Sequence, residues 1–376
     1  MSSSARSSSD RPTGACDAIV VGAGQSGLAA AHALRRAGLA PVVLEAGPEP
    51  VGSWPRYYDS LTLFSPARYS SLPGLPFPGD PDRYPHRDEV ADYLRRYATR
   101  LDAEIRTDQR VHAVDGVPGS YVVRTGDHTL TTPLLIAATG GFGNPHRPAL
   151  PGLDAFTGQV LHVSDYRAPQ PFAGRHVVIV GGGNSAAQIG VELARHARVT
   201  LATRAPVKYA PQIVLGRDMH WWSTTLGVDH LPVGPYLRAA PSVPVVDDGT
   251  HRAAIDSGEP ARMPLFTDLD GTDVTWPDGR TEQVDTIMLA TGYRPDLPYL
   301  ADLGALDEHG RPLQVRGLST SHPGLGFVGL EWQRSLASAT LRGVGRDAAY
   351  VVTRLLRNRG ALPAPRCCER QPAGTA

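Results

Sequence analysis

The sequence predicts an α/β protein in which one structural unit occurs twice. Residues 17–22 form an apolar run that ends in glycine, and a second such run ends at Gly181. Each run continues into a glycine-rich turn, a helical pattern and another apolar run. This order of strand, turn, helix and strand is typical of Rossmann-like dinucleotide-binding domains. We therefore predict two such domains, the second inserted in the first.

The first unit reads DAIVVGAGQSG and places Gly22, Gly24 and Gly27 in the GxGxxG pattern. The first glycine permits a tight turn, the second lets the backbone approach a pyrophosphate, and the third lets the helix pack closely on the strand. The helix start offers free N–H groups and a partial positive charge to phosphates. Gln25 and Ser26 lie in the same turn and belong to the predicted site.

The second unit reads HVVIVGGGNSA and places Gly181, Gly183 and Ala186 at the equivalent positions. Asn184 and Ser185 lie at the expected helix start and are predicted to contact the second dinucleotide. The alternative for either unit is a glycine-rich turn without a ligand. The flanking strands in both units favour the dinucleotide site.

The residue after the second strand distinguishes the two ligands. Glu45 lies 18 positions after Gly27, and Arg204 lies 18 positions after Ala186. A carboxylate accepts hydrogen bonds from the ribose diol of FAD or NAD, whereas a guanidinium pairs with a 2′-phosphate. Thr203 and Lys208 add a hydroxyl and a second charge. The sequence thus predicts FAD in the first unit and NADPH in the second, with a solvated surface arginine as the alternative for Arg204.

Two further apolar runs, 133–140 and 285–293, each end in a glycine turn and are expected to return to a Rossmann sheet. A helix is expected around residues 345–358, with Gly345 and Asp347 at its start. Its buried face is predicted to hold four apolar residues, Ala348, Val351, Val352 and Leu355. The predicted division is a disordered tail at 1–14, an FAD domain at 15–155 and 287–360, an NADP domain at 165–286, and a disordered tail at 361–376.

The amino-acid composition indicates which binding partners and which cell compartment to expect. The 37 basic and 37 acidic residues balance, so charge gives no reason to expect nucleic acid or an anionic membrane. No run approaches the ~18 apolar residues of a spanning helix, and the Ser-rich start lacks a signal-peptide core. We expect a cytoplasmic protein without a metal site. Cys367 and Cys368 are expected to be exposed thiols, with a soft-metal pair as the alternative. A homodimer is left open.

Two further motifs resemble those of a known family. FTGQVLHVSDY carries Phe156, Gly158, His162 and Tyr166 in the pattern FxGxxxHxxx(F/W/Y), and residues 285–298 match D-x3-L-ATGY-x4-P. Together with the two nucleotide patterns, these motifs make the chain similar to the class B flavin-dependent monooxygenases. That family includes flavin-containing monooxygenases, N-hydroxylating enzymes and plant YUCCA-type enzymes.

The resemblance assigns further cofactor residues. It implies that Phe156, Gly158 and His162 form a linker against which the NADP domain moves. His162 is the only side chain considered for proton transfer, and a buried histidine that fixes this linker is the alternative. Further FAD contacts are expected from Ser53, Trp54, the backbone of Val111, Thr139, Gly329 and Gln333. Further NADP contacts are expected from Thr291 and Gly292.

The resemblance also implies the reaction. NADPH would reduce FAD, and the reduced flavin would transfer one oxygen atom from O2 to a small molecule through a flavin hydroperoxide, with nitrogen or sulfur as the expected acceptor. Two features depart from relatives: residues 55–80 contain no Asn, which amine-oxidising members have there, and Tyr166-Arg167 replaces the WP of Baeyer–Villiger enzymes. Either Thr62, Ser65 or a backbone group replaces the missing amide, or the substrate class differs.

Several alternatives to N- or S-oxygenation stay open. Baeyer–Villiger-type or keto-acid oxygenation comes second, followed by a non-oxygenating NADPH–flavin reductase and a non-catalytic flavoprotein. A disulfide reductase would need a redox dithiol beside the flavin, and the sequence has no CxxC. Residues 205–270 are left unassigned: they either cover the active site, form a subunit contact or pack in the core.

Overall fold

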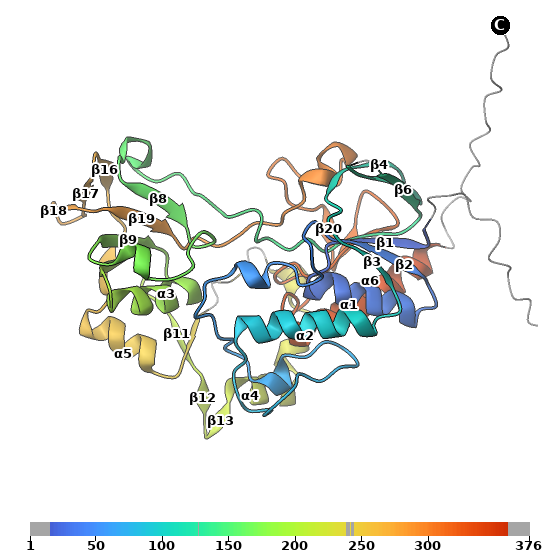
Figure 1. The fold of residues 1–376 in the computed structure, drawn as a ribbon, viewed down its shortest axis with the longest axis horizontal. Coiled ribbons are helices and arrows are strands. Elements are labelled where there is room, and N and C mark those ends of the chain that lie inside the picture. The colour runs from blue at the N-terminus through green and yellow to red at the C-terminus, as the bar shows by residue number, and fades with distance from the viewer. Residues whose placement is uncertain (1–15, 127, 238–240, 242–243, 360–376) are drawn as a thin grey trace, which may run out of the picture.

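The computed structural model describes residues 16–126, 128–237, 241 and 244–359. Two α/β units lie side by side, and a thin pair of connections joins them (Figure 1). The predicted tails at 1–14 and 361–376, including Cys367 and Cys368, lie outside the described residues. The predicted fold class, two Rossmann-like units in an α/β protein, is confirmed.

The first unit is built on a seven-stranded sheet with the order β20-β21-β22-β7-β1-β2-β3. Its five strands from β22 to β3 are parallel, and β1 and β7 are buried throughout, as expected for a sheet covered on both faces. The strands are β1 (Ala18–Val21), β2 (Pro41–Leu44), β3 (Glu104–Arg106), β7 (Leu135–Ala137), β20 (Gln314–Val315), β21 (Leu318–Ser319) and β22 (Leu325–Phe327).

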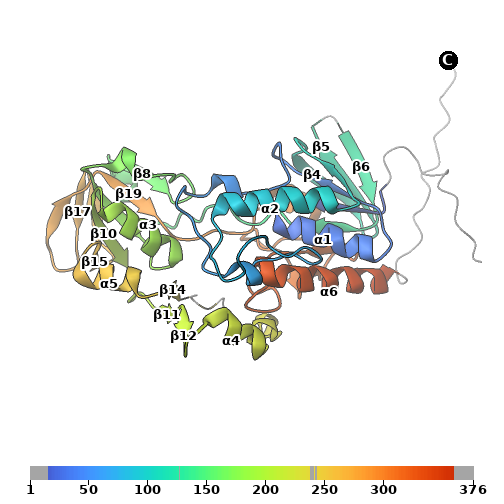
Figure 2. The same ribbon diagram turned by 60° about the horizontal axis from the view of Figure 1, so that its bottom comes forward.

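Three helices cover one face of this sheet: α1 (Gln25–Arg36), α2 (Arg87–Arg100) and α6 (Leu341–Arg359). Helix α1 lies between the other two (Figure 2). His86 caps α2 and forms a capping box with Glu89, which fixes where that helix begins. The predicted apolar face of α6 is confirmed, because Ala348, Val351, Val352 and Leu355 are all buried.

Helix α6 begins at Leu341, one turn before the predicted start at Gly345. Leu341 and Val344 are buried in the core of the first unit. Their packing extends the helix through Gly343 and Gly345, although glycine is a poor helix former. The prediction of the start was therefore wrong because tertiary packing outweighs local propensity here.

The other face of the sheet carries a small antiparallel sheet and a 3-10 helix. The small sheet consists of β4 (Val111–Val117), β5 (Ser120–Thr125) and β6 (His128–Thr132). It packs with η7 (Pro298–Leu303) in one apolar core. The shorter 3-10 segments are η1 (Trp54–Arg56), η2 (Ala67–Tyr69), η3 (Leu153–Ala155), η4 (Gln170–Phe172), η5 (Val228–His230) and η6 (Gly234–Tyr236).

The second unit is built on a parallel five-stranded sheet with the order β15-β10-β9-β19-β8. Helices α3 (Asn184–Ala194) and α5 (Thr250–Ser257) pack on it, together with a three-stranded antiparallel sheet. The strands of the two sheets are β8 (Gln159–His162), β9 (His176–Val180), β10 (Arg198–Thr203), β15 (Ala261–Pro264), β16 (Asp268–Asp270), β17 (Asp273–Thr275), β18 (Thr281–Gln283) and β19 (Thr286–Leu289).

The pairing of β19 corrects the domain limits predicted from the sequence. Strand β19 pairs with β9 on one side and β8 on the other, so the boundary at residue 287 falls inside a strand of the second sheet. Residues 159–162, expected to lie in a linker, form the edge strand β8. The strand pattern was correct, but an apolar run does not encode which of two parallel sheets it joins.

Two chain segments cross between the units as an antiparallel ribbon, which we call the hinge ribbon (residues 140–146 and 291–296). Pro145 and Tyr293 form a β-bridge, and the backbone of Arg294 donates to the carbonyl of Asn144. From the first unit, Tyr58 inserts into the core of the second unit next to this ribbon. The ribbon is the covalent connection between the two sheets (Figure 1).

A long excursion separates β10 from α5. It contains β11 (Tyr209–Pro211), β12 (Ile213–Val214), β13 (Arg217–Asp218), α4 (Met219–Thr225) and β14 (Val245–Asp247). Strands β11 and β14 pair in parallel, so the intervening chain leaves the second unit and returns to it. In Figures 1 and 2 its hairpin lies below the space between the two units, and α4 lies beside it, on the side of the first unit. Residues 205–270 thus include both this excursion and part of the second sheet.

Candidate functional site: two helix starts that face a dinucleotide

The turn from β1 to α1 has the geometry of a phosphate-binding loop. Gly22 adopts φ 98°, and a Cβ there would lie 2.7 Å from the carbonyl oxygen of Ala138. A Cβ on Gly27 would lie only 1.7 Å from the oxygen of Gly22, so only glycine fits. Among the described residues no side chain caps α1 at Gly24. Its first N–H groups are therefore available to a phosphate.

Glu45 lies directly after β2, beside this loop, and is 9% exposed. Its carboxylate accepts hydrogen bonds from the backbone N–H groups of Ala23 at 2.6 Å and Gly47 at 2.9 Å. These bonds fix both oxygens at the edge of the nucleotide loop. A carboxylate oxygen has more than one acceptor site, so the same group can also accept from a ribose diol.

Gln25, the first residue of α1, joins three parts of the first unit. Its side-chain amide donates to the carbonyl of Ala339 at 2.7 Å and accepts from the Trp54 indole at 2.9 Å. Gly52 packs against Gly24, where an added Cβ would lie 2.8 Å from the Cα of Gly24. The predicted segment with Ser53 and Trp54 therefore lies at the start of α1, as a flavin contact requires.

The other residues predicted to contact FAD lie in four separate segments of the first unit. Gly329 packs on Ser26, because a Cβ there would meet the hydroxyl at 2.0 Å. Thr139 follows β7 and donates to the carbonyl of Asp296 at 2.5 Å. Val111 begins β4 and is buried with the residues of β2. Gln333 is buried and points toward Gly317, and its amide nitrogen has no partner within the described part of the chain.

The turn from β9 to α3 repeats this geometry. Gly181 adopts φ 142°, and a Cβ there would lie 2.3 Å from the oxygen of Ala290. Gly183 precedes α3, and no described side chain caps that helix start either. The side chain of Asn184 already makes a hydrogen bond within the protein, since its amide oxygen accepts from the backbone N–H of Val246 at 3.0 Å. Ser185 is half-buried in the first turn of α3.

Arg204 directly follows β10, and its charge acts on His146 together with that of a second arginine, Arg294. Thr203, the last residue of the strand, is buried, whereas Arg204 is exposed. Burial first, and then the charges of Arg294 and Arg204, lower the pKa of His146. The field at this position therefore favours an anion. His146 and Arg294 were not predicted, because both come from the hinge ribbon, far from Arg204 along the chain.

Lys208 lies farther along the same edge of the second unit. Its side chain is exposed, and its carbonyl accepts from the backbone of Val245, which anchors β14. Thr203, Arg204 and Lys208 thus follow one another along the chain from the end of β10, and only Thr203 of the three is buried.

A row of aromatic rings crosses between the units along the hinge ribbon. Trp54 contacts Tyr57, which packs edge-on against Phe142 at 4.7 Å between ring centroids. Phe142 stacks on Tyr293 at 5.5 Å. Burial raises the pKa of Tyr57 and of Tyr293, so both rings stay neutral. Trp54 was predicted as a flavin contact and Tyr293 lies in the ATGY motif, but their connection through the loop residues Tyr57 and Phe142 was not predicted.

His162 lies at the end of this row and is fully buried. One ring nitrogen is 3.1 Å from the hydroxyl of Ser164, and the other is 3.1 Å from the carbonyl of Gly292. Its ring packs edge-on against Tyr293. Because burial lowers its pKa and both nitrogens have partners, this geometry suits a histidine that fixes the hinge ribbon. Thr291 and Gly292 also belong to the ribbon, and Thr291 donates to the carbonyl of His146.

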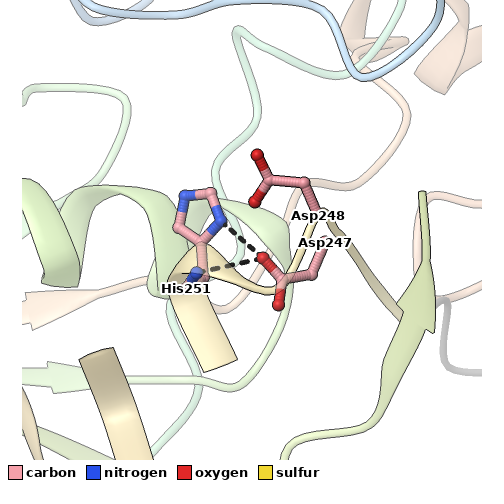
Figure 3. A group of neighbouring side chains, drawn as sticks. All are labelled: Asp247, Asp248 and His251. Atoms are coloured by element: carbon pink, nitrogen blue, oxygen red, sulfur yellow. Dashed lines mark hydrogen bonds and ion pairs between the residues drawn. The ribbon is translucent and has the colours of Figure 1, made fainter. Parts of the chain in front are cut away.

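One group of side chains resembles a metal site, Asp247, Asp248 and His251 (Figure 3). Asp247 accepts from both the backbone and the ring of His251 at 3.0 Å, and from the backbone of Arg252 at 3.1 Å. Asp248 accepts from the backbone of Thr250 at 2.9 Å. The two carboxylates therefore satisfy the free N–H groups at the start of α5, which accounts for the cluster.

Comparison with known proteins agrees with this geometry. A family model described as pyridine nucleotide-disulphide oxidoreductase matches residues 19–215. An uncharacterized oxidoreductase CzcO of Bacillus subtilis is 33% identical over 343 residues, which cover 90% of this chain and 99% of that protein. Indole-3-pyruvate monooxygenase YUCCA1 of Oryza sativa subsp. japonica is 33% identical over 331 residues, covering 79% of this chain and 81% of that protein.

A solved structure shows the same arrangement. The flavin-containing monooxygenase from Stenotrophomonas maltophilia superposes with a TM-score of 0.80 at 32% identity, covering 92% of this chain and 99% of that chain. No helix in the described residues is long and apolar enough to cross a membrane. The family and the flavin monooxygenases it resembles imply the use of FAD and NAD(P)H, and the two helix starts fit both groups. The chain belongs to the pyridine nucleotide-disulphide oxidoreductase family and, within it, to the flavin-dependent monooxygenases.

Proposed function

We propose that the protein is an NADPH- and FAD-dependent monooxygenase that transfers one oxygen atom from O2 to nitrogen or sulfur of a small molecule. One observation carries the assignment of cofactors. Two uncapped helix starts follow equivalent strands, with a buried carboxylate at the end of one second strand and an exposed guanidinium at the end of the other. The matching positions select different nucleotides.

The side chains of the first unit would hold FAD. The N–H groups at Gly24 and Gln25 would bind the diphosphate, and Glu45 would accept from the ribose. Gln25 would orient Trp54 beside the isoalloxazine ring through the hydrogen bond already present. FAD supplies the redox and oxygen chemistry when it is bound, so the chain needs no acid–base pair of its own.

The second unit would hold NADPH and bring it to the first. The N–H groups at Gly183 would bind the diphosphate, and Arg204, supported by Arg294, would pair with the 2′-phosphate. The aromatic row of Trp54, Tyr57, Phe142 and Tyr293 would form an apolar wall between the two sites. Exclusion of water is the task of such a wall, because hydration diverts the reduced cofactor toward peroxide.

A 2-keto acid is the second candidate substrate. The identity with indole-3-pyruvate monooxygenases supports it. The absence of Asn from residues 55–80 also weakens the case for amines. Ser65, a candidate to replace that amide, shares a hydrogen bond with the hydroxyl of Ser70 at 2.9 Å, so its hydroxyl already has an internal partner.

The test is a screen with isotopic oxygen. The purified protein is given NADPH and 18O2 with amines, sulfides and 2-keto acids in turn, and product mass and NADPH consumption are measured. A substrate should speed NADPH oxidation and appear in a product that carries one 18O atom. If NADPH oxidation yields only peroxide with every compound class, the monooxygenase assignment fails and a reductase or oxidase remains.

A further inference from the structure

The excursion from the second unit docks on the first unit through a segment that we call the clasp (residues 212–237). Strands β11 and β14 hold its two ends in the second unit. The hydrogen bonds of its middle go elsewhere, to loops and helices of the first unit. Figures 1 and 2 show the hinge ribbon above and the clasp below, on opposite sides of the gap between the sheets.

The near end of the clasp lies against residues 64–84 of the first unit. Tyr84 donates its hydroxyl proton to Asp218 at 2.7 Å. Asp218 also accepts from the ring of His220, which is 2% exposed. That ring stacks against both Phe64 and Tyr69, with centroids 6.1 and 6.2 Å away. This end of the clasp is therefore a buried contact between the two units.

The far end is held by an ion pair that is buried from solvent. The guanidinium of Arg342, in the first turn of α6, donates to both oxygens of Asp229 at 2.8 and 3.0 Å. Asp229 is 0% exposed, and the Arg342 side chain is 12% exposed. Burial alone would raise the pKa of Asp229, but the adjacent guanidinium outweighs it and holds this pKa below its usual value. The pair therefore stays charged and bidentate.

A third contact closes the end of the clasp. The backbone N–H of Gly234 donates to the carbonyl of Arg334 at 2.9 Å. A Cβ on Gly234 would lie 1.9 Å from the carbonyl oxygen of Trp332, so only glycine permits this approach. Arg316 donates to the hydroxyl of Tyr236 at 2.8 Å.

These contacts end close to the predicted flavin site. Arg342 lies three residues after Ala339, whose carbonyl accepts from Gln25 at the start of α1. Gln25 in turn accepts from Trp54. A displacement of the first turn of α6 is therefore transmitted directly to the residues that would orient the flavin.

We propose that Asp229 and Arg342 are positioning residues, which fix the nicotinamide-binding unit over the flavin-binding unit. The hinge ribbon and the neighbouring Tyr58 hold the second unit along one side, where it can pivot, whereas an attachment on the opposite side of the gap opposes that motion. The consequence for hydride transfer rests on the proposed function, since hydride transfer needs the start of α3 at a fixed distance from the start of α1. The attachment itself does not depend on the reaction.

The first experiment compares Asp229→Asn with Glu282→Gln in the full-length, FAD-loaded protein. Glu282 also pairs with an arginine, Arg198, but both lie in the second unit. Asp229→Asn should slow anaerobic flavin reduction by NADPH about tenfold or more, with kcat affected far more than KM. Glu282→Gln should change the rate by less than about twofold.

Hydrogen exchange separates this proposal from the reaction. In Asp229→Asn, amides of residues 212–237 should exchange at least about tenfold faster, while β9 and β1 keep their protection. This readout needs no turnover, so it holds even if the protein proves not to be an oxygenase. Unchanged exchange and an unchanged reduction rate in folded Asp229→Asn would overturn the proposal.

Two further variants guard against misfolding. Tyr84→Phe removes one clasp contact without leaving a charge unpaired, and it should give the same two effects at smaller size. The exchanged pair, Asp229→Arg with Arg342→Asp, should recover part of the lost reduction rate. If Tyr84→Phe and the exchanged pair both fold, and neither differs from Glu282→Gln, the clasp has no positioning role.

Discussion

The two helix starts of this protein are built alike and differ in the residue that follows the second strand. Glu45 is buried, and backbone N–H groups of the nucleotide loop fix both its oxygens. Arg204 is exposed, and Arg294 and His146 lie close enough to share its field. In each unit, therefore, the glycine-rich loop supplies affinity for a diphosphate, while the residue after the second strand selects the ribose. A buried acid suits a permanently bound cofactor, and an exposed base suits one that exchanges.

The largest difference between the units in cofactor affinity is expected from a substitution at the third small residue of the GxGxxG/A pattern. Gly27→Ala places a methyl group 1.7 Å from the oxygen of Gly22, so the turn must distort. Such overpacking costs ~1–3 kcal/mol, which corresponds to roughly 5- to 150-fold weaker FAD binding. The measurement is the Kd of FAD, by titration of the apoprotein. The second unit already has alanine there.

The matched change in the second unit is Ala186→Gly. It removes a methyl group from α3 and should lower stability by ~1 kcal/mol through helix propensity alone. The KM for NADPH should stay within about twofold of the wild type. Equal loss of cofactor binding in both variants would contradict the packing argument for Gly27.

Glu45→Gln is expected to weaken FAD binding less than Gly27→Ala does. The amide keeps one acceptor oxygen but loses the charge that holds the N–H of Ala23. Hydrogen bonds to charged groups contribute ~1.5–3 kcal/mol and those to neutral groups ~0.5–1.5 kcal/mol, so the loss of ~1 kcal/mol should weaken FAD binding about fivefold. NADPH binding should not change, which steady-state KM values would check. A variant with wild-type FAD affinity would show that the carboxylate only braces the loop.

The smallest effect concerns acid stability. His162 and His176 are buried in the second sheet, and burial lowers both pKa values below the usual 6.5. The unfolded chain therefore binds these protons at a higher pH than the folded one. Stability should fall as the pH drops below about 6.5, and the second unit should lose protection first.

The thermal midpoint of His176→Gln at pH 7.5 and 5.5 tests this expectation. The drop in Tm between those values should narrow by a few degrees relative to the wild type. Gln retains hydrogen-bonding groups near the carbonyl of Gln283 and the hydroxyl of Thr200, which His176 now contacts. If the drop in Tm of His176→Gln equals that of the wild type, titratable groups other than His176 cause the loss of stability in acid.

The sequence predicted those features whose causes are local. The glycines of both loops, the positions of Glu45 and Arg204, and the buried face of α6 follow from the periodicity and spacing of neighbouring residues. Strand β19 was predicted as a strand but assigned to the wrong sheet, because its apolar pattern fits either. The start of α6 was wrong because Leu341 and Val344 gain their burial only from tertiary packing.

The missed parts of the site come from distant segments. Arg294 and His146 reach Arg204 through the hinge ribbon, and the aromatic row joins loops around residues 54, 142 and 293. The clasp pairs residues 113 positions apart, Asp229 and Arg342. Such contacts depend on how the two units are placed, which no local pattern encodes.

The most direct test of the central claim is nucleotide preference at Arg204. The wild-type protein should have a lower KM for NADPH than for NADH. Arg204→Ala should raise the KM for NADPH about 30-fold, equivalent to ~2 kcal/mol, and leave the KM for NADH within about twofold. If the substitution weakens both nucleotides equally, Arg204 does not bind the 2′-phosphate, and the assignment of the second helix start to NADPH is contradicted.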